Sequence, residues 1–226
     1  MPLSPIERER AKTEAQAAID AASLGLERGT LDDRAWTRAV ADALGSAYLR
    51  DDDPRWQSGF DGDSQLWRDA RELILAPVHR DGTFLDIGCA TGHLMECLQS
   101  WARERGRRLS MFGLELSSVL VARARGQLPG LADQIFEGNV LDWSPPHTFT
   151  FVHAGLEYVP TARRPWLVRR LVDHFVAPDG RLIVGPVDDA ELPATIGAFE
   201  RAETSPETSR RTDRNRKTRH VVWCRT

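Results

Sequence analysis

The amino-acid sequence predicts an α/β fold, a doubly wound and mainly parallel sheet with a helical segment in front of it. Residues 4–76 carry helical patterns, with an ordered loop at residues 55–63. From residue 83 onward, short apolar stretches of strand length alternate with helical stretches, which is typical of βαβ units and of a parallel sheet. We therefore divide the 226 residues into an N-terminal helical segment, 1–77, and an α/β domain, 78–226.

Three helices are expected in the helical segment. The first begins at Ser4, because a serine followed by a proline is a common helix start. The second carries apolar side chains four residues apart from Trp36 to Tyr48, and this spacing places them on one face. The expected bounds of the three helices are 4–28, 31–49 and about 63–76.

Five strands and three helices are expected in the first part of the α/β domain. The strands are predicted at 83–88, 109–115, 134–138, 148–153 and 180–186, and the helices at about 91–105, 117–127 and 163–176. Residues 198–204 and 219–225 are also expected to be strands, joined by a polar, arginine-rich link. A link without a crossover helix favours antiparallel pairing, so we predict a closing hairpin at one edge of the sheet.

The charge and the cysteine content argue against several classes of protein. The formal net charge is −3 and the pI is near 6.1, so no strong positive field is available to attract nucleic acid. Cys89, Cys97 and Cys224 show no metal-binding spacing, and neither a metal site nor a disulfide framework is predicted. No apolar run approaches about 18 residues and no signal-peptide pattern is seen, so no membrane span is predicted and the cytoplasm is the expected location.

The stretch from Phe84 to Leu94 has the pattern of a strand, a glycine-bounded turn and a helix N-terminus. Gly88 allows a tight turn out of the strand, and Gly92 would let the helix backbone come close to a ligand. Ligands of such sheets bind at the carboxyl ends of the strands, so an adenosine cofactor is expected here.

The residues around this turn favour one cofactor. A dinucleotide fingerprint would need glycine where Ala90 and His93 stand, which argues against a nucleotide-dependent oxidoreductase. No G-K-[S/T] triplet of a phosphate-binding loop occurs. Asp86 lies two residues before the first glycine, where its carboxylate suits a cationic ligand and repels a phosphate. S-adenosylmethionine carries an ammonium and a sulfonium and has no phosphate.

The run from Leu85 to Gly92 resembles motif I of the class I S-adenosylmethionine-dependent methyltransferases, an acid followed by G-x-G-x-G. Ala90 replaces the middle glycine and is small enough to be expected to fit. Glu115 ends the second strand, where the family places an acid that binds the two ribose hydroxyls. Asn139 follows the third strand, at the place of the family's aspartate on the adenine amino group, and its amide oxygen would still accept.

Further matches extend the resemblance over about residues 80–226. The run from Pro178 to Leu182 resembles the P-G-G-x-L turn before the fifth strand. The resemblance implies the strand order 3-2-1-4-5-7-6 with an antiparallel last strand. It also implies S-adenosylmethionine as cofactor and S-adenosylhomocysteine as product. The cofactor-binding residues expected in the α/β domain are Asp86, Gly88, Cys89, Ala90, Gly92, Glu115, Leu116, Asn139, Val140 and His153.

The helical segment is expected to complete the cofactor site. Gln57 and Ser58 would hydrogen-bond the methionine carboxylate, and Arg71 would form an ion pair with it. Trp56 and Phe60 lie in an ordered loop where many family members have a lid, and their rings would cover the sulfonium. In the alternative interpretation, these aromatic rings pack the front helices onto the sheet.

The end of the fourth strand is where a catalytic residue is expected. Methyl transfer depends mainly on positioning, and a general base is needed only if the acceptor must lose a proton. His153 and Glu157 are the candidate bases, and Tyr158 follows them. Alternatively, His153 only stabilises the strand end by a backbone hydrogen bond, and catalysis proceeds by proximity alone.

These features predict a methyltransferase acting on O or N of a small molecule, a specialised metabolite, with the segment 1–77 over the acceptor pocket. The first alternative is an RNA- or protein-modifying methyltransferase that docks through the basic run Arg210–His220. The near-neutral whole-chain charge disfavours nucleic acid as a partner, since such a run is commonly a solvated turn. The second alternative is a non-catalytic, cofactor-binding partner subunit.

Overall fold

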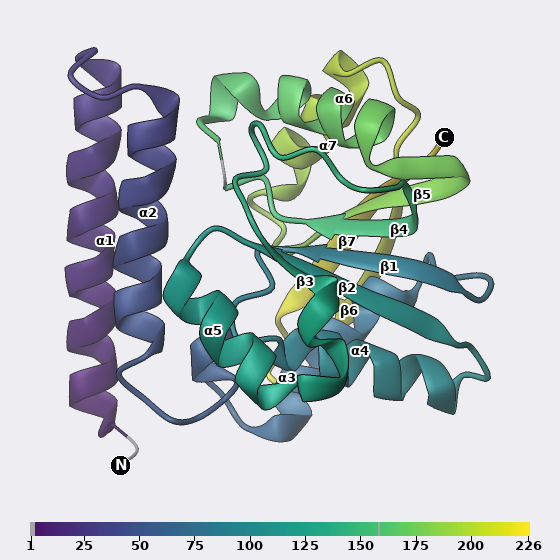
Figure 1. The fold of residues 1–226 in the computed structure, drawn as a ribbon, viewed down its shortest axis with the longest axis horizontal. Coiled ribbons are helices and arrows are strands. Elements are labelled where there is room, and N and C mark those ends of the chain that lie inside the picture. Colours follow the sequence, from purple (N-terminus) through teal and green to yellow (C-terminus); the bar gives the residue numbers. More distant parts are fainter. Residues whose placement is uncertain (1–2, 158) are drawn as a thin grey trace.

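The computed structural model describes residues 3–157 and 159–226. Seven strands form one sheet with helices against both of its faces, and a helical hairpin stands beside it (Figure 1). This confirms the predicted doubly wound α/β fold with a helical segment in front. Within the described residues, no helix has the length and apolar character needed to cross a membrane.

The strand order in the sheet is β3-β2-β1-β4-β5-β7-β6, as the resemblance implied. β7 runs antiparallel to both of its neighbours, and every other pairing is parallel. The strands are β1 (Gly82–Ile87), β2 (Leu109–Glu115), β3 (Ile135–Glu137), β4 (Phe149–Ala154), β5 (Val176–Val187), β6 (Glu207–Thr212) and β7 (Thr218–Arg225).

The helices begin and end close to the predicted bounds. α1 starts with a reciprocal cap, because Ser4 Oγ accepts from the Glu7 backbone N–H and the Glu7 carboxylate accepts from the Ser4 N–H. The helices are α1 (Pro5–Glu27), α2 (Asp33–Tyr48), α3 (Ser64–Arg71), α4 (His93–Glu104), α5 (Ser118–Gln127), α6 (Arg164–His174) and α7 (Leu192–Arg201). Short 3₁₀ turns occupy Trp56–Ser58, Glu72–Leu75, Pro129–Gln134 and Thr161–Arg163.

The central strands are buried on both faces and divide the apolar side chains between two cores. In β1, Leu85 and Ile87 face α6 and α7, whereas Phe84 faces α3, α4 and α5. The alternation follows from the strand geometry, in which successive side chains point to opposite faces. In β5, Leu182 joins the first core and Ile183 the second. The sheet is thereby held rigid beneath the ends of its strands.

The predicted strand at residues 198–204 is wrong. Most of that segment belongs to helix α7, and the edge strand β6 follows it. Pro193 stands in the first turn of α7, and Thr195, Ala198 and Phe199 are buried three to four residues apart, which is helical spacing. β6 is polar and largely exposed, so no apolar alternation marks it in the sequence. The predicted closing hairpin is confirmed, with β6 and β7 as its strands.

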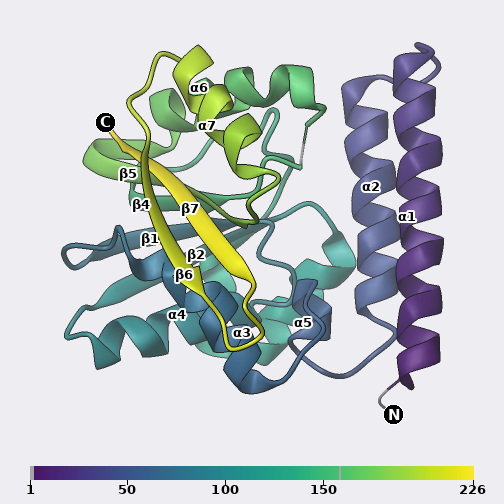
Figure 2. The same ribbon diagram turned by 180° about the vertical axis from the view of Figure 1, so that it is seen from behind.

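Helices α1 and α2 form a hairpin with a small apolar core of its own. Trp36 and Val40 of α2 pack with Ala22 of α1, separately from the two cores of the sheet. Views from the front and from behind agree that α2 lies between α1 and the rest of the molecule (Figures 1 and 2). One side of α2 therefore faces α1, and the other faces the sheet domain.

Ion pairs and one close contact join α2 to the sheet domain. Asp33 pairs with Arg163, and Arg34 pairs with Asp142. These side chains are largely solvent-accessible, and such pairs contribute about 0–1 kcal/mol each. Gly45 lies close to α5, because a Cβ atom there would be 3.3 Å from the Ser117 hydroxyl oxygen. The attachment of α2 is therefore mainly polar, in contrast to the packing of α6 and α7.

Replacing Phe199 by alanine tests the packing of α7 against the sheet. Phe199 is fully buried between α7 and the sheet, so Phe199→Ala is expected to lower the free energy of unfolding by roughly 3–5 kcal/mol. The neighbouring Glu200 is exposed, and Glu200→Ala should change the free energy of unfolding by less than about 0.5 kcal/mol. Urea denaturation followed by circular dichroism gives both values. Equal effects of the two substitutions would contradict the burial of Phe199 between α7 and the sheet.

Candidate active site

A cavity of about 440 Å³ opens at the carboxyl ends of the central strands. This volume lies within the range of roughly 300–1,000 Å³ that is usual for small-molecule sites. The α2 face predicted from the four-residue spacing supplies one wall, and the strand ends supply the opposite one. The wall residues of α2 are Trp36, Thr37, Val40, Ala41, Leu44 and Tyr48.

The turn after β1 lines the floor of the cavity. Gly88 has φ of 76° and Ala90 has φ of 48°, so both lie in the left-handed region. Ala90 stands where motif I has its middle glycine, and it adopts the backbone conformation that a glycine would take freely. Its N–H donates to the Glu115 carboxylate at 3.0 Å. Cys89 also lines the cavity, and burial raises the pKa of its thiol well above its ordinary value.

Asp86 and His153 form a buried pair between the two central strands. They are partners in the β1–β4 register, and Asp86 Oδ1 lies 2.7 Å from His153 Nδ1. His153 Nε2 lies 2.6 Å from the carbonyl oxygen of Gly185. Both ring nitrogens of His153 therefore face oxygen acceptors, which leaves neither to take a proton from a ligand. The second carboxylate oxygen of Asp86, Oδ2, is buried without a hydrogen-bond partner in the described structure.

Glu115 ends β2 and directs its carboxylate toward the same turn. Its oxygens accept from the backbone N–H groups of Ser117 at 2.9 Å and Ala90 at 3.0 Å. Burial raises the pKa of Glu115, although these backbone donors lower it in part. Each carboxylate oxygen has a further lone pair, so the held carboxylate can still accept hydrogen bonds from a ligand.

The residues after β2 and β3 line the part of the cavity next to Glu115. Leu116, Asn139 and Val140 all belong to its wall. Asn139 Oδ1 accepts from the Leu141 backbone N–H at 3.0 Å, so the side chain also shapes its own turn. One lone pair of that oxygen remains for a ligand.

Arg71 brings an unpaired positive charge to the cavity. It makes no hydrogen bond or ion pair within the part of the chain that the structure describes, and it lies over the rings of Phe60 and Trp67, 5.5 and 5.2 Å from their centres. Burial and, secondly, the charge of Arg219 lower the pKa of Arg71 to about 10. The guanidinium therefore stays protonated at neutral pH. Asp86 is among the acids that act on its charge.

Two of the expected site residues, Gln57 and Gly92, do not belong to the cavity wall. Gln57 is buried and donates its amide to the carbonyl of Asp51 at 2.8 Å. Gly92 has φ of 83° and starts α4, and the space beside it is filled by Leu128. Neither residue lines the cavity, although the Gly92 N–H donates to the carbonyl of Cys89 at 2.8 Å and so closes the turn that does.

The loop aromatics pack against the protein's own cations. Trp56 is buried, donates to the carbonyl of Ala47 at 2.9 Å and lies beneath Arg8. Phe60 packs edge-on against Trp67. Neither Trp56 nor Phe60 belongs to the cavity wall, which agrees with the interpretation of these rings as packing residues.

Glu157 and several residues that the sequence did not single out complete the wall. Burial and then the carboxylates of Glu157 and Glu115 raise the pKa of Tyr48 to about 12, so its phenol stays neutral. Tyr158 lies outside the described residues. The wall residues that the sequence analysis did not single out include Thr37, Arg164, Pro186, Val187, Glu191 and Thr195.

Comparisons with known proteins agree with this geometry. No protein-family model matches the chain. Trans-aconitate 2-methyltransferase from Methylobacterium nodulans is 31% identical over 130 residues, which are 56% of this chain and 47% of that protein. The enzyme of the same name from Acidovorax ebreus is 30% identical over 153 residues, 65% of this chain and 54% of that protein. The chain thus spans about half the length of the curated relatives it matches.

Solved structures share the architecture over most of the chain. The [4+2]-cyclase SpnF superposes with a TM-score of 0.60 at 13% identity, covering 84% of this chain and 96% of its own. A TehB-like S-adenosylmethionine-dependent methyltransferase from Corynebacterium glutamicum gives a TM-score of 0.51 at 16% identity, covering 82% and 100%. The chain therefore has the fold of the class I methyltransferases. The resemblance of the sequence to that family, carried by motif I, is thereby confirmed.

The left-handed residue in motif I of this methyltransferase fold offers a test of backbone strain. Ala90→Gly should leave the free energy of unfolding unchanged or raise it by up to about 1 kcal/mol, because relieved strain outweighs the added freedom of the unfolded chain. Ala90→Val should lower it by at least about 2 kcal/mol, since a β-branched residue is strongly disfavoured at positive φ. Urea denaturation measures both variants. Equal stability of the two would show that Ala90 is not held in this conformation.

Proposed function

We propose that this chain is an S-adenosylmethionine-dependent methyltransferase acting on O or N of a small-molecule acceptor. The observation that carries the proposal is the buried, unpartnered Oδ2 of Asp86 in the wall of the cavity. A desolvated carboxylate oxygen needs a cationic or donor group, and the ammonium of S-adenosylmethionine is such a group. The names of the two relatives specify methyl transfer to trans-aconitate, which supports a small-molecule acceptor.

The residues of the cavity fit the parts of S-adenosylmethionine. Asp86 would hold the ammonium, and Arg71 would hold the carboxylate of the same methionine group. Glu115 would accept from the ribose hydroxyls with the lone pairs that its backbone donors leave free. Leu116, Asn139 and Val140 would enclose the adenine. When bound, S-adenosylmethionine supplies a methyl group made electrophilic by its sulfonium.

The protein's own contribution is mainly to hold and orient groups. His153 fixes the carboxylate of Asp86 by its Nδ1 contact and is itself fixed by the carbonyl of Gly185. Orientation of reacting groups can lower a barrier by roughly 7–11 kcal/mol. Of the two candidate bases, Glu157 would take a proton from the acceptor where one must leave, because both nitrogens of His153 are engaged.

The segment 1–77 would act as a lid over the acceptor. α2 supplies a wall of the cavity, yet its connections to the sheet domain are largely exposed ion pairs. Such contacts break at little cost, so the hairpin of α1 and α2 can admit a ligand without disturbing the sheet. Apolar side chains such as Trp36 and Val40 would exclude water from the acceptor.

The basic run near the C-terminus favours the small-molecule acceptor over RNA. Arg211 forms ion pairs with Glu72 and Asp69, and Arg214 pairs with Asp63. These charges serve to attach the hairpin of β6 and β7 to the helical segment. They contribute little to a field that would attract phosphates.

Calorimetric titration with S-adenosylhomocysteine tests the cofactor. Wild-type protein is expected to bind it saturably at micromolar concentration and to ignore NADH. Asp86→Asn, which keeps the shape but removes the charge, should weaken binding at least about tenfold, and Lys217→Gln on the exposed hairpin turn should not. Absence of binding to wild-type protein, or full affinity in Asp86→Asn, would refute the assigned site.

Variants of His153 separate a positioning role from a catalytic one. His153→Ala should weaken S-adenosylhomocysteine binding roughly 10- to 100-fold, because Asp86 loses its hydrogen bond. His153→Asn places an amide donor near Nδ1 and should restore most of the affinity. A general base would behave differently: both variants would keep the affinity, and both would lose turnover in a methyl-transfer assay.

A further inference from the structure

Arg164 is a cavity-lining guanidinium without a partner. It is the first residue of α6, it belongs to the cavity wall, and its Nε is buried without a hydrogen bond. The described structure gives it no ion pair either. A buried N–H donor without a partner is unfavourable, so a ligand in the cavity is the natural source of the missing acceptor.

The neighbouring arginines show that Arg164 is an exception on its helix. Arg163 pairs with Asp33, and Arg169 pairs with Asp173. Arg170 donates to the backbone carbonyls after β3, at 2.9 and 2.8 Å. Glu191 lines the same cavity as Arg164, yet the described residues form no ion pair between them. Each of these three arginines therefore finds an acceptor within the protein, whereas Arg164 does not.

The position of Arg164 assigns it to the acceptor rather than to the cofactor. Asp86, Glu115 and Asn139 occupy the ends of β1, β2 and β3, whereas α6 follows β4. The ion pair of Arg163 with Asp33 places the start of α6 against the first turn of α2. Arg164 thus lies beside the apolar wall that α2 contributes to the cavity.

We propose that Arg164 binds a carboxylate of the methyl acceptor, which is therefore an organic acid with an apolar body. The proposal rests on the proposed function, because it takes the cavity to hold both cofactor and acceptor. A guanidinium presents two parallel N–H donors that match the two oxygens of a carboxylate. A phosphate dianion fits less well, since Glu191 on the same wall would repel its second charge.

Matched acid and amide probes test this proposal on protein saturated with S-adenosylhomocysteine. The pairs are 4-hydroxybenzoate and 4-hydroxybenzamide, cinnamate and cinnamamide, and hexanoate and hexanamide, with 4-nitrophenyl phosphate as the phosphate probe. Ligand-observed NMR titration gives each dissociation constant. Acids should bind roughly 10- to 100-fold more tightly than their amides, and more tightly than the phosphate.

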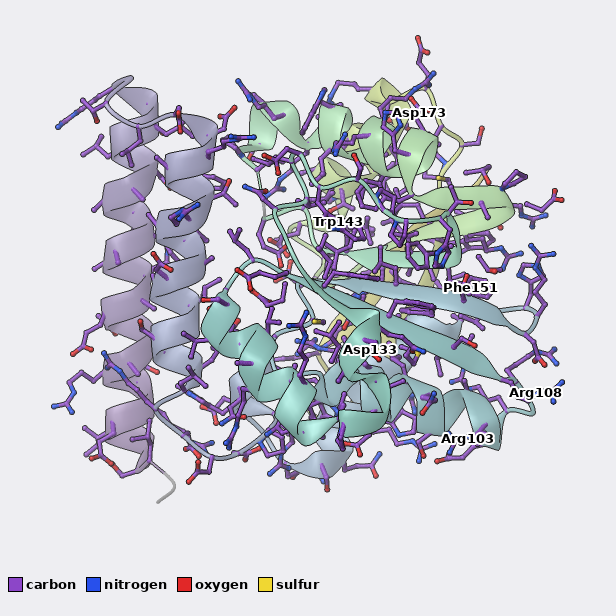
Figure 3. All side chains as sticks on the ribbon, viewed as in Figure 1. Arg103, Arg108, Asp133, Trp143, Phe151 and Asp173 are labelled. Carbon is purple, nitrogen blue, oxygen red and sulfur yellow. The ribbon has the colours of Figure 1, made fainter. Side chains whose placement is uncertain are left out.

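Substitutions of Arg164 then assign the preference to this residue. Arg164→Gln should abolish the preference for acids. Arg164→Lys should keep part of it, because a lysine has the positive charge but lacks the two parallel N–H donors of a guanidinium. Arg103→Gln is the control for loss of one charge, since Arg103 is exposed on α4, far from α2 (Figure 3). All variants should bind S-adenosylhomocysteine as wild type does, which shows that they fold.

The outcomes distinguish the two proposals. Equal binding of acids and amides, no binding of any acid, or an acid preference that survives in Arg164→Gln overturns the role of Arg164 while cofactor binding stands. Stronger binding of the phosphate probe overturns the choice of a carboxylate. If wild-type protein fails to bind S-adenosylhomocysteine, the proposed function fails and the acceptor proposal falls with it.

Discussion

The hydrogen bond between Asp86 and His153 joins the two central strands at the point where the cavity opens. β1 and β4 are parallel and pair these residues in register, so both side chains emerge at the same level. The carbonyl of Gly185 holds the other side of the ring, which ties β5 to the same network. One oxygen of Asp86 is consumed by this bond and the other is left buried without a partner. Glu115 and Arg71 lie on the wall of the same cavity.

The strand side of the site was predictable from the sequence because parallel strands end at the same edge of a sheet. Asp86, Glu115 and Asn139 each lie at or just after the end of an apolar stretch, and the structure brings them to one cavity. The contact that immobilises Asp86 was not predictable in the same way. It requires β4 to lie beside β1, which follows from the strand order and not from any local pattern around His153.

On the side of the cavity formed by the helical segment, the spacing of apolar residues predicts the helix but not what its apolar face contacts. The apolar face from Trp36 to Tyr48 was correctly placed on one side of α2, yet its spacing is the same whether the face meets a core or a cavity. Gln57 shows the converse, since a polar side chain in a loop was expected to face a ligand and is instead bound to backbone. Arg163 and Arg164 are adjacent in sequence, and only the fold separates the paired guanidinium from the unpaired one.

Fold alone does not decide the chemistry, because the cyclase SpnF shares this architecture. The charged residues on the cavity wall limit which ligands the cavity can bind. Asp86 and Glu115 are held by the protein and still have acceptor capacity, whereas Arg71 and Arg164 are cations without anionic partners among the described residues. The carboxylate of one methionine group can neutralise Arg71 alone. A neutral acceptor without a hydrogen-bond acceptor group at this place would leave the buried Nε of Arg164 without a partner. The charges on the cavity wall therefore support the proposal of an acidic acceptor.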